Sequence, residues 1–119
     1  MAKILIVDDE KMICEEFCDI LSDEGHEVDM ATSGVEALEK FEEKVFDLVF
    51  LDVLMPRMEG REVFEGMKKI HPTVPIVIMS GYLPFNREAD ILSMGAMTCL
   101  RKPLELDRVR DVIRLASTK

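Results

Sequence analysis

Four short polar segments of this sequence each come directly after an apolar run. Their acidic, hydroxyl and amino side chains could act together in one site. Asp8-Asp9-Glu10 follows the first run, Asp52 a second, Ser80-Gly81 a third, and Lys102-Pro103 a fourth. Alone, each is a weak signal, because acidic residues at strand ends usually belong to solvated turns or helix caps, and a single lysine is usually a surface residue. Gathered at one place, they would combine carboxylates, a hydroxyl and an ammonium group.

Such a group favours a bound cation, because carboxylates that lie close together repel one another. Mg²⁺ takes one or two carboxylates together with water and phosphate oxygens. The cation and Lys102 would then neutralise an incoming phosphoryl group while Asp52 attacks it as a nucleophile. Ser80 can donate a hydrogen bond to a phosphate oxygen, and Gly81 lets the backbone approach closely. The chemistry indicated is phosphoryl transfer to an aspartate.

Apolar runs predict five strands that could hold these segments. The predicted strands are Lys3–Val7, Glu27–Met30, Asp47–Leu51, Pro75–Met79 and Met97–Leu100. The first, third and fourth are continuously apolar, which is typical of parallel strands buried on both faces. The second and fifth are shorter and more mixed, which suits the edges of a sheet.

Helices are predicted between the strands from apolar residues at helical spacing. A capping-box pattern opens the second helix at Ser33, and a fourth, weaker helix is expected around 86–94. The apolar stripes of the other four are Ile13, Phe17, Ile20 and Leu21; Val35, Leu38, Phe41 and Val45; Val63, Phe64, Met67 and Ile70; and Val109, Val112, Ile113 and Ala116.

Strand and helix thus alternate through the 119 residues without a linker, repeat or low-complexity tract. This pattern predicts an α/β doubly wound parallel sheet with helices on both faces, as a single domain over residues 1–119. Ligands of such folds bind beyond the carboxyl ends of the strands. The four polar segments fall at those ends, so we expect them to meet.

Composition narrows the class of protein further. The net charge of −9 argues against direct nucleic-acid binding. The longest aliphatic run, Ile4–Val7, is far short of the roughly 20 residues that cross a bilayer, and the first residues do not resemble a secretory signal. We therefore expect a cytoplasmic protein that does not bind membranes. Its three cysteines, Cys14, Cys18 and Cys99, are expected to be reduced, small apolar residues.

The motifs resemble those of the receiver domains of bacterial two-component response regulators, including chemotaxis receivers, over essentially the full chain. The matching stretches are Ile4–Glu10 (ILIVDDE), Leu51–Gly60 (LDVLMPRMEG), Ile78–Gly81 (IMSG), and Gly95-Ala96 followed by Lys102-Pro103-Leu104. Their order and separations make the resemblance specific. It implies a flavodoxin-like (βα)₅ fold with strand order 2-1-3-4-5.

The resemblance also implies a role for each site residue. Asp52 would be the phosphoacceptor and, with Asp9 and the backbone carbonyl of Leu54, a ligand of Mg²⁺, while Asp8 would act through water. Lys102 would contact the phosphoryl oxygens and form a cis peptide with Pro103. Ser80 would move to meet the phosphoryl group. Such a protein catalyses its own phosphorylation and dephosphorylation and is not a turnover enzyme.

One position departs from the family pattern. Cys99 stands three residues before the lysine, where receivers usually have an aromatic residue that swings inward when the serine or threonine moves. Either the thiol is a harmless small residue, or switching relies on Ser80 and the fourth helix. Leu54 and Tyr82, two residues after Asp52 and Ser80, could screen the site from water, which predicts slow loss of the phosphoryl group.

Partners follow from the resemblance as well. We expect a sensor histidine kinase or a histidine phosphotransfer protein as phosphoryl donor, docking near Met12 and Ile13. The downstream effector is unknown, and a homodimer could form through the fourth helix, fifth strand and fifth helix. No output domain is expected within the chain, which is either a single-domain relay or part of a longer regulator.

Three other functions compete with this interpretation. A flavodoxin-type electron carrier would need a phosphate-binding loop of Ser, Thr and Gly where this chain has Asp8-Asp9-Glu10. A phosphatase of the haloacid dehalogenase type would need an aspartate in place of Leu54. A receiver-like interaction module that is never phosphorylated is the serious alternative, and the complete set of acids with Ser80 and Lys102 argues against it.

Overall fold

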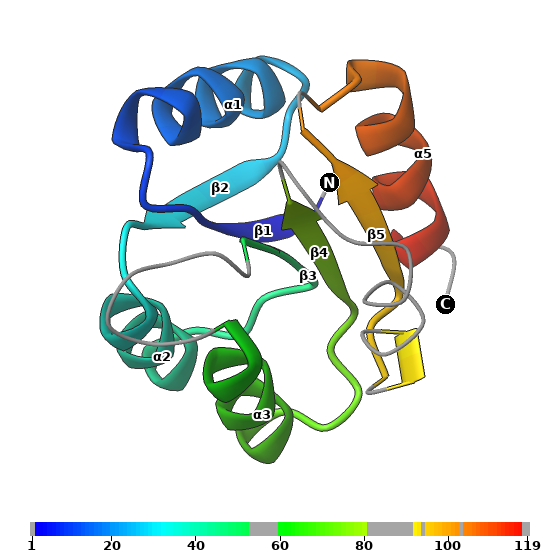
Figure 1. Cartoon of the computed structure of the whole chain (residues 1–119). Helices are drawn as coiled ribbons and strands as arrows, with labels where there is room; N and C mark the ends of the chain where they lie inside the picture. Colours follow the sequence, from blue (N-terminus) through cyan, green and yellow to red (C-terminus); the bar gives the residue numbers. More distant parts are fainter. Residues whose placement is uncertain (1, 53–59, 81–91, 94, 103, 118–119) are drawn as a thin grey trace.

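Five parallel strands form one sheet in the computed structural model of the chain, which describes residues 2–52, 60–80, 92–93, 95–102 and 104–117 (Figure 1). The strand order is β2-β1-β3-β4-β5, so the predicted order is confirmed. The strands are β1 (Lys3–Val7), β2 (Glu27–Ala31), β3 (Leu48–Asp52), β4 (Ile76–Ser80) and β5 (Thr98–Arg101).

Four of the predicted strand ends fall one residue too early. The pairing of β3 with β4 continues to Asp52 opposite Met79, and that of β4 with β5 continues to Ser80 opposite Arg101. Because parallel neighbours hydrogen-bond through their backbones whatever the side chains are, the ladder extends past the last apolar residue. Asp52 and Ser80 are therefore held by the sheet itself.

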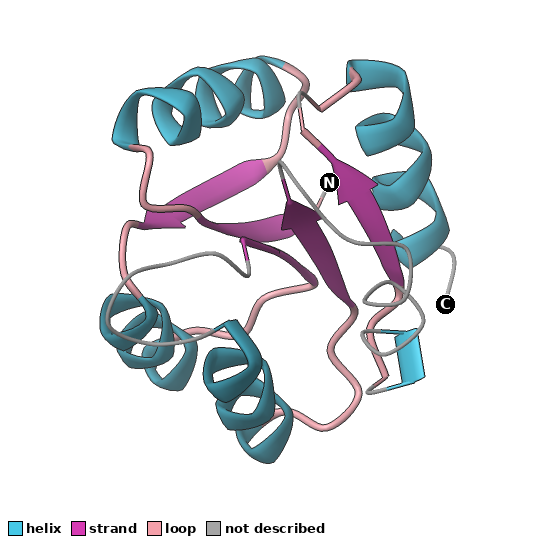
Figure 2. Cartoon of the chain, viewed as in Figure 1, coloured by secondary structure: helices cyan, strands magenta, loops and turns pink. Residues whose placement is uncertain are grey.

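Helices cover both faces of the sheet, as predicted (Figures 1 and 2). α1 (Lys11–Asp23) and α5 (Leu106–Ser117) lie on one face, and α2 (Gly34–Glu43) and α3 (Gly60–Ile70) lie on the other. Successive residues of a strand point to opposite faces. Ile4 and Ile6 of β1 accordingly join the core under α1 and α5, whereas Leu5 and Val7 join the core under α2 and α3.

Local sequence signals set the ends of two helices. The Oγ atom of Ser33 accepts a hydrogen bond from the Glu36 N–H at 3.1 Å, and the Glu36 carboxylate accepts one from the Thr32 N–H at 2.7 Å. The first contact confirms the Ser33 cap predicted for α2, whereas Glu36 reaches back to the residue before the cap and not to Ser33 itself. After α1, Gly25 adopts a φ of 94°, a left-handed conformation that glycine tolerates best.

The buried stripe of α1 differs from the predicted one. Cys14 and Leu21 are fully buried, with Phe17 and Cys18 partly buried between them, whereas Ile13 and Ile20 are exposed. The stripe is therefore rotated by about one residue towards the cysteines, which act as small apolar residues. None of the three cysteines, all within the described residues, forms a disulfide. Burial, as the largest cause, raises the pKa of Cys14 to about 12.

Three other residues of the predicted apolar stripes are exposed: Val35, Val45 and Ile70. Val35 and Val45 are exposed because α2 turns them away from the sheet and ends before the second of them. Ile70, at the end of α3, is also exposed. Most of the expected helix around 86–94 lies outside the described residues, although Leu92 and Ser93 are helical. Among the helices that the structure describes, none has both the length and the apolar character to cross a membrane.

The rotated stripe of α1 makes a prediction about stability. Leu21 is 0% exposed and its neighbour Ile20 is 40% exposed. We expect Leu21→Ala to lower the free energy of unfolding by about 2–5 kcal/mol through lost burial and an unfilled cavity. Ile20→Ala should cost less than about 1 kcal/mol. Urea denaturation of both variants measures the difference, and equal losses would contradict the assigned face of α1.

Candidate functional site

Three of the predicted site residues meet at the carboxyl edge of the sheet. Asp8 follows β1, Asp52 ends β3, and Lys102 follows β5. The Lys102 ammonium donates hydrogen bonds to Asp8 Oδ2 at 2.6 Å and to Asp52 Oδ2 at 3.0 Å. The expectation that oppositely charged groups from separate strands converge here is therefore correct for these residues.

The two aspartates are nearly removed from solvent. Asp8 is 1% exposed and Asp52 is 4% exposed. Buried carboxylates are costly unless they are paired and hydrogen-bonded. Burial by itself would lower the pKa of Lys102, but the hydrogen bonds to Asp8 and Asp52 outweigh it and raise that pKa above its ordinary value. The ammonium therefore stays charged throughout the physiological pH range.

Backbone hydrogen bonds hold the segments after β1 and β5 at the site. The Lys102 N–H donates to the Ser80 carbonyl at 2.8 Å, which carries the β4–β5 pairing beyond β5. The Glu10 N–H donates to Asp8 Oδ1 at 3.0 Å. Both oxygens of the Asp8 carboxylate thus have a donor, and the loops after β1 and β5 are joined through one side chain.

Asp8, Asp9 and Asp52 could hold a metal ion together. Each offers a carboxylate oxygen, and these atoms all lie within 4.8 Å of one another. Oxygens bound to one Mg²⁺ stand roughly 3–4 Å apart, so small side-chain movements would complete the site. Three carboxylates form a hard, anionic donor set, which suits Mg²⁺, Mn²⁺ or Ca²⁺ better than softer metals. The residues therefore fit the cation that the sequence predicted.

The other predicted site residues divide into two groups. Ser80 is 2% exposed at the end of β4, and half-buried Cys99 lies on β5 opposite Ile78, packed against the core under α2 and α3. Four residues with predicted roles lie outside the described part of the chain: Leu54, Gly81, Tyr82 and Pro103.

Glu10 reaches the site as well, although the sequence predicts no separate role for it. Its Oε1 atom lies 3.6 Å from the Lys102 ammonium, and its side chain is 58% exposed. The available signal was its position directly after Asp8-Asp9. That position leaves open whether the side chain points towards the lysine or into solvent, so sequence alone could not assign the contact.

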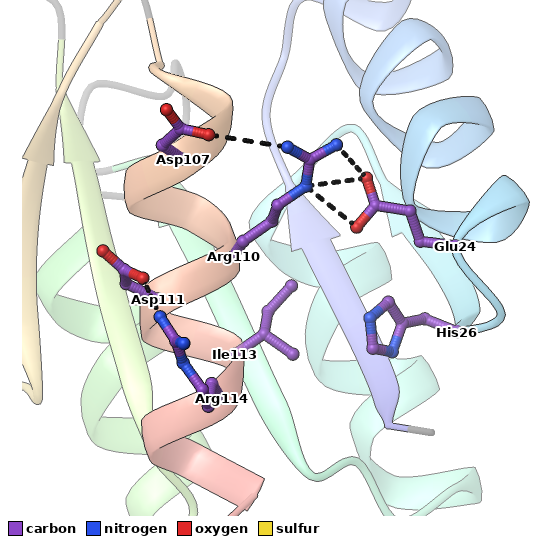
Figure 3. Close-up of a pocket in the computed structure, with 7 residues that line it drawn as sticks. All are labelled: Glu24, His26, Asp107, Arg110, Asp111, Ile113 and Arg114. Carbon is purple, nitrogen blue, oxygen red and sulfur yellow. Dashed lines mark hydrogen bonds and ion pairs between the residues drawn. The ribbon is translucent and has the colours of Figure 1, made fainter.

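A pocket of about 500 Å³ lies elsewhere, between the end of α1 and the outer side of α5 (Figure 3). Arg110 donates hydrogen bonds to both carboxylate oxygens of Glu24, at 2.8 Å to 3.2 Å, and Arg114 pairs with Asp111. Glu24 lies just before β2, towards the amino ends of the strands and away from Asp52. The pair of Glu24 with Arg110 links the end of α1 to α5, whereas the pair of Arg114 with Asp111 lies within α5. We assign the pocket no chemistry.

The structure defines a doubly wound α/β protein with a group of three aspartates at the carboxyl edge of its sheet, and comparison with known proteins gives the family. Residues 4–114 match the response regulator receiver domain. The chain is 33% identical to the sporulation initiation phosphotransferase F of Bacillus subtilis over 112 residues, which are 94% of this chain and 90% of that protein. This chain belongs to the response regulator receiver domain family.

Two further relatives extend the comparison. The chain is 38% identical over 107 residues, 90% of its length, to the transcriptional regulatory protein ZraR of Klebsiella oxytoca, of which it spans only 24%. Among solved structures, a CheY-like receiver domain protein from Methanospirillum hungatei is 30% identical with a TM-score of 0.88, and the similarity covers 99% of this chain and 98% of that one.

The pair between Glu24 and Arg110 makes a prediction about pH. The hydrogen bond from Arg110 is the main cause that lowers the pKa of Glu24. A carboxyl with a lowered pKa stabilises the fold above its unfolded pKa of about 4.3, and this stabilisation is lost as the pH falls through the folded value. We expect Glu24→Gln to lower the melting temperature at about pH 7 and to differ progressively less from the native protein towards about pH 3.

Glu39→Gln, on the exposed side of α2, is the matched control for the change in net charge. Its effect on the melting temperature should be smaller at neutral pH. A Glu24→Gln deficit that stays constant as the pH falls would contradict the ionic origin of the contact.

Proposed function

We propose that this domain accepts a phosphoryl group on Asp52 from a phosphohistidine, assisted by Mg²⁺, and changes conformation in response. The observation that carries the proposal is the position of Lys102, which lies 3.0 Å from Asp52 Oδ2 and 2.6 Å from Asp8 Oδ2 within the acidic group. A partly buried lysine between two carboxylates supplies the fixed positive charge that a phosphoryl group needs on arrival.

The transfer is an in-line displacement. A carboxylate oxygen of Asp52 attacks phosphorus, the bond from phosphorus to the histidine nitrogen breaks, and the electron pair stays on the imidazole, which then takes up a proton. Lys102 neutralises part of the negative charge on the phosphoryl oxygens. Bound Mg²⁺ would supply the rest of the charge neutralisation at the same oxygens.

The contacts of the three aspartates support different roles for them in binding the metal ion. Asp9 and Asp52 would bind Mg²⁺ directly, together with the backbone carbonyl of Leu54. One oxygen of Asp8 already accepts a hydrogen bond from the Glu10 N–H, so a role through a bound water suits it better. Mg²⁺ usually keeps several waters in such sites.

The output would be a shift between two conformations. New contacts from the phosphoryl group to Lys102 and to the hydroxyl of Ser80 would favour the minor state. A full reversal from 1:99 to 99:1 requires about 5.5 kcal/mol of differential interaction. Cys99 would leave more space beside Ser80 than an aromatic residue does, so the coupling between the two positions should be weaker than is usual in the family.

Partners are proposed on the same basis. The phosphoryl donor would be a sensor histidine kinase or a phosphotransfer protein in the cytoplasm, and exposed Met12 and Ile13 at the start of α1 would suit its docking. A homodimer could use the face that includes β5 and α5. We propose residues 1–119 as one receiver domain that modifies itself and turns over no separate substrate.

The metal part of the proposal predicts a change in stability. Mg²⁺ that binds the folded state alone stabilises that state by RT ln(1 + c/Kd), where c is the concentration of Mg²⁺, so the melting temperature rises with that concentration. We expect millimolar Mg²⁺ to stabilise the native protein and to leave Asp9→Asn nearly unaffected, as measured by thermal unfolding. Asp23→Asn, an exposed aspartate at the end of α1, should respond as the native protein does. Equal responses of the two variants would contradict the assigned site.

The phosphoryl part is tested by incubation with Mg²⁺ and acetyl phosphate, followed by intact mass spectrometry. We expect the mass of one phosphoryl group to be added to the native protein and to Asp23→Asn, and none to Asp52→Asn. Removal of Mg²⁺ with a chelator should abolish the addition. No added mass in the native protein would favour a receiver-like interaction module, and the same assay followed over time measures the lifetime of the aspartyl phosphate.

A further inference from the structure

Lys102 lies among three carboxylates, and only two of them belong to the candidate metal site. Asp8 and Asp52 do belong to it, and their side chains are 2% and 5% exposed. The third, Glu10, lies 3.6 Å from the ammonium with a side chain that is 58% exposed. Its backbone is nevertheless fixed to the site by the hydrogen bond from its N–H to Asp8 Oδ1.

Lys102 and a divalent cation would compete for the same two aspartates. The ammonium already contacts one oxygen of each. Two cations held close together in a buried site repel strongly, so a metal ion bound by Asp8, Asp9 and Asp52 weakens the hold of the first and last of these on the lysine. A lysine without another partner would turn to solvent and leave the place where the phosphoryl group arrives.

Glu10 can provide that other partner. It is close enough to attract Lys102 and is not among the carboxylates of the metal group. Because its side chain is more than half exposed, it can follow the ammonium at a small cost in hydration and rotamer freedom. The nearly buried side chains of Asp8 and Asp52 cannot move in this way without opening the core.

We propose that Glu10 is a positioning residue, which takes over Lys102 when a divalent cation occupies Asp8, Asp9 and Asp52 and so keeps the ammonium beside the phosphoacceptor. This inference rests on the metal and the phosphoryl chemistry proposed above. Without the carboxylate of Glu10, it costs more free energy to displace Lys102 from the two aspartates. The lysine then competes more strongly with the cation.

The test is the affinity for Mg²⁺, measured by calorimetry on the whole chain without any phosphoryl donor. Glu10→Gln should weaken Mg²⁺ binding about 2- to 5-fold, the range expected for one partly exposed charge pair. Glu15→Gln makes the same change in net charge one turn further along α1, where Glu15 pairs with Lys11. It should weaken binding clearly less, and equal affinities of the two variants would overturn the proposal.

Repeating the comparison in the Lys102→Met variant shows whether Glu10 affects Mg²⁺ affinity through Lys102 or by acting directly on the cation. In Lys102→Met, Glu10→Gln should weaken Mg²⁺ binding no more than Glu15→Gln does. An undiminished loss in that background would overturn the proposal, because Glu10 would then act on the metal directly. Should Lys102→Met fail to fold, the comparison in the native background decides alone.

Failure of the role proposed for Glu10 can be distinguished from failure of the proposed phosphoryl transfer. If Asp52 accepts no phosphoryl group while the effect of Glu10 still depends on Lys102, the role in cation binding stands and only the phosphoryl transfer is refuted. If Asp52 is phosphorylated while Glu10 and Glu15 behave alike, only the role of Glu10 is refuted. Absence of Mg²⁺ binding to the native protein would overturn both the inference and the metal site.

Discussion

The ion pairs of Lys102 with Asp8 and Asp52 are the interaction on which the candidate site depends. They join residues that are 94 and 50 positions apart in the chain, and they place one positive charge between two nearly buried carboxylates. Removing a charged group from water costs several kcal/mol, which only a close and hydrogen-bonded partner can offset. The lysine thus offsets part of the cost of burying the two aspartates at the edge of the sheet.

The order of the strands brings the residues of the candidate site to one edge of the sheet. β1 and β3 are neighbours, so Asp8 and Asp52 emerge side by side at the carboxyl edge, where the direction of strand progression reverses. β4 lies next to β3 and brings Ser80 to the same edge, and the β4–β5 pairing continues to Lys102. Two layers of helices bury the strands on both faces and hold these ends in place.

Much of this arrangement could be predicted from the sequence, since continuous apolar runs and strand-end motifs are properties of short segments. Sequence could not show that the ladder includes Asp52 and Ser80, because backbone pairing continues where apolar character stops. It placed Ile13 and Ile20 in the buried stripe of α1, because aliphatic side chains were weighted above Cys14, which the packing buries instead. Contacts such as Glu10 with Lys102 and Glu24 with Arg110 depend on the rotamers of side chains far apart in the chain, on which a local pattern carries no information.

If the three aspartates form one cation site in competition with Lys102, a bound metal ion should be visible there. Crystals of the protein grown with Mn²⁺ in place of Mg²⁺, and an anomalous difference map calculated from them, would locate the ion. We expect one strong peak within coordination distance of Asp9 and Asp52, with the Lys102 ammonium displaced from Asp8 but still beside the site. A peak elsewhere on the protein, or a lysine that keeps both of its present contacts beside a bound ion, would contradict this expectation.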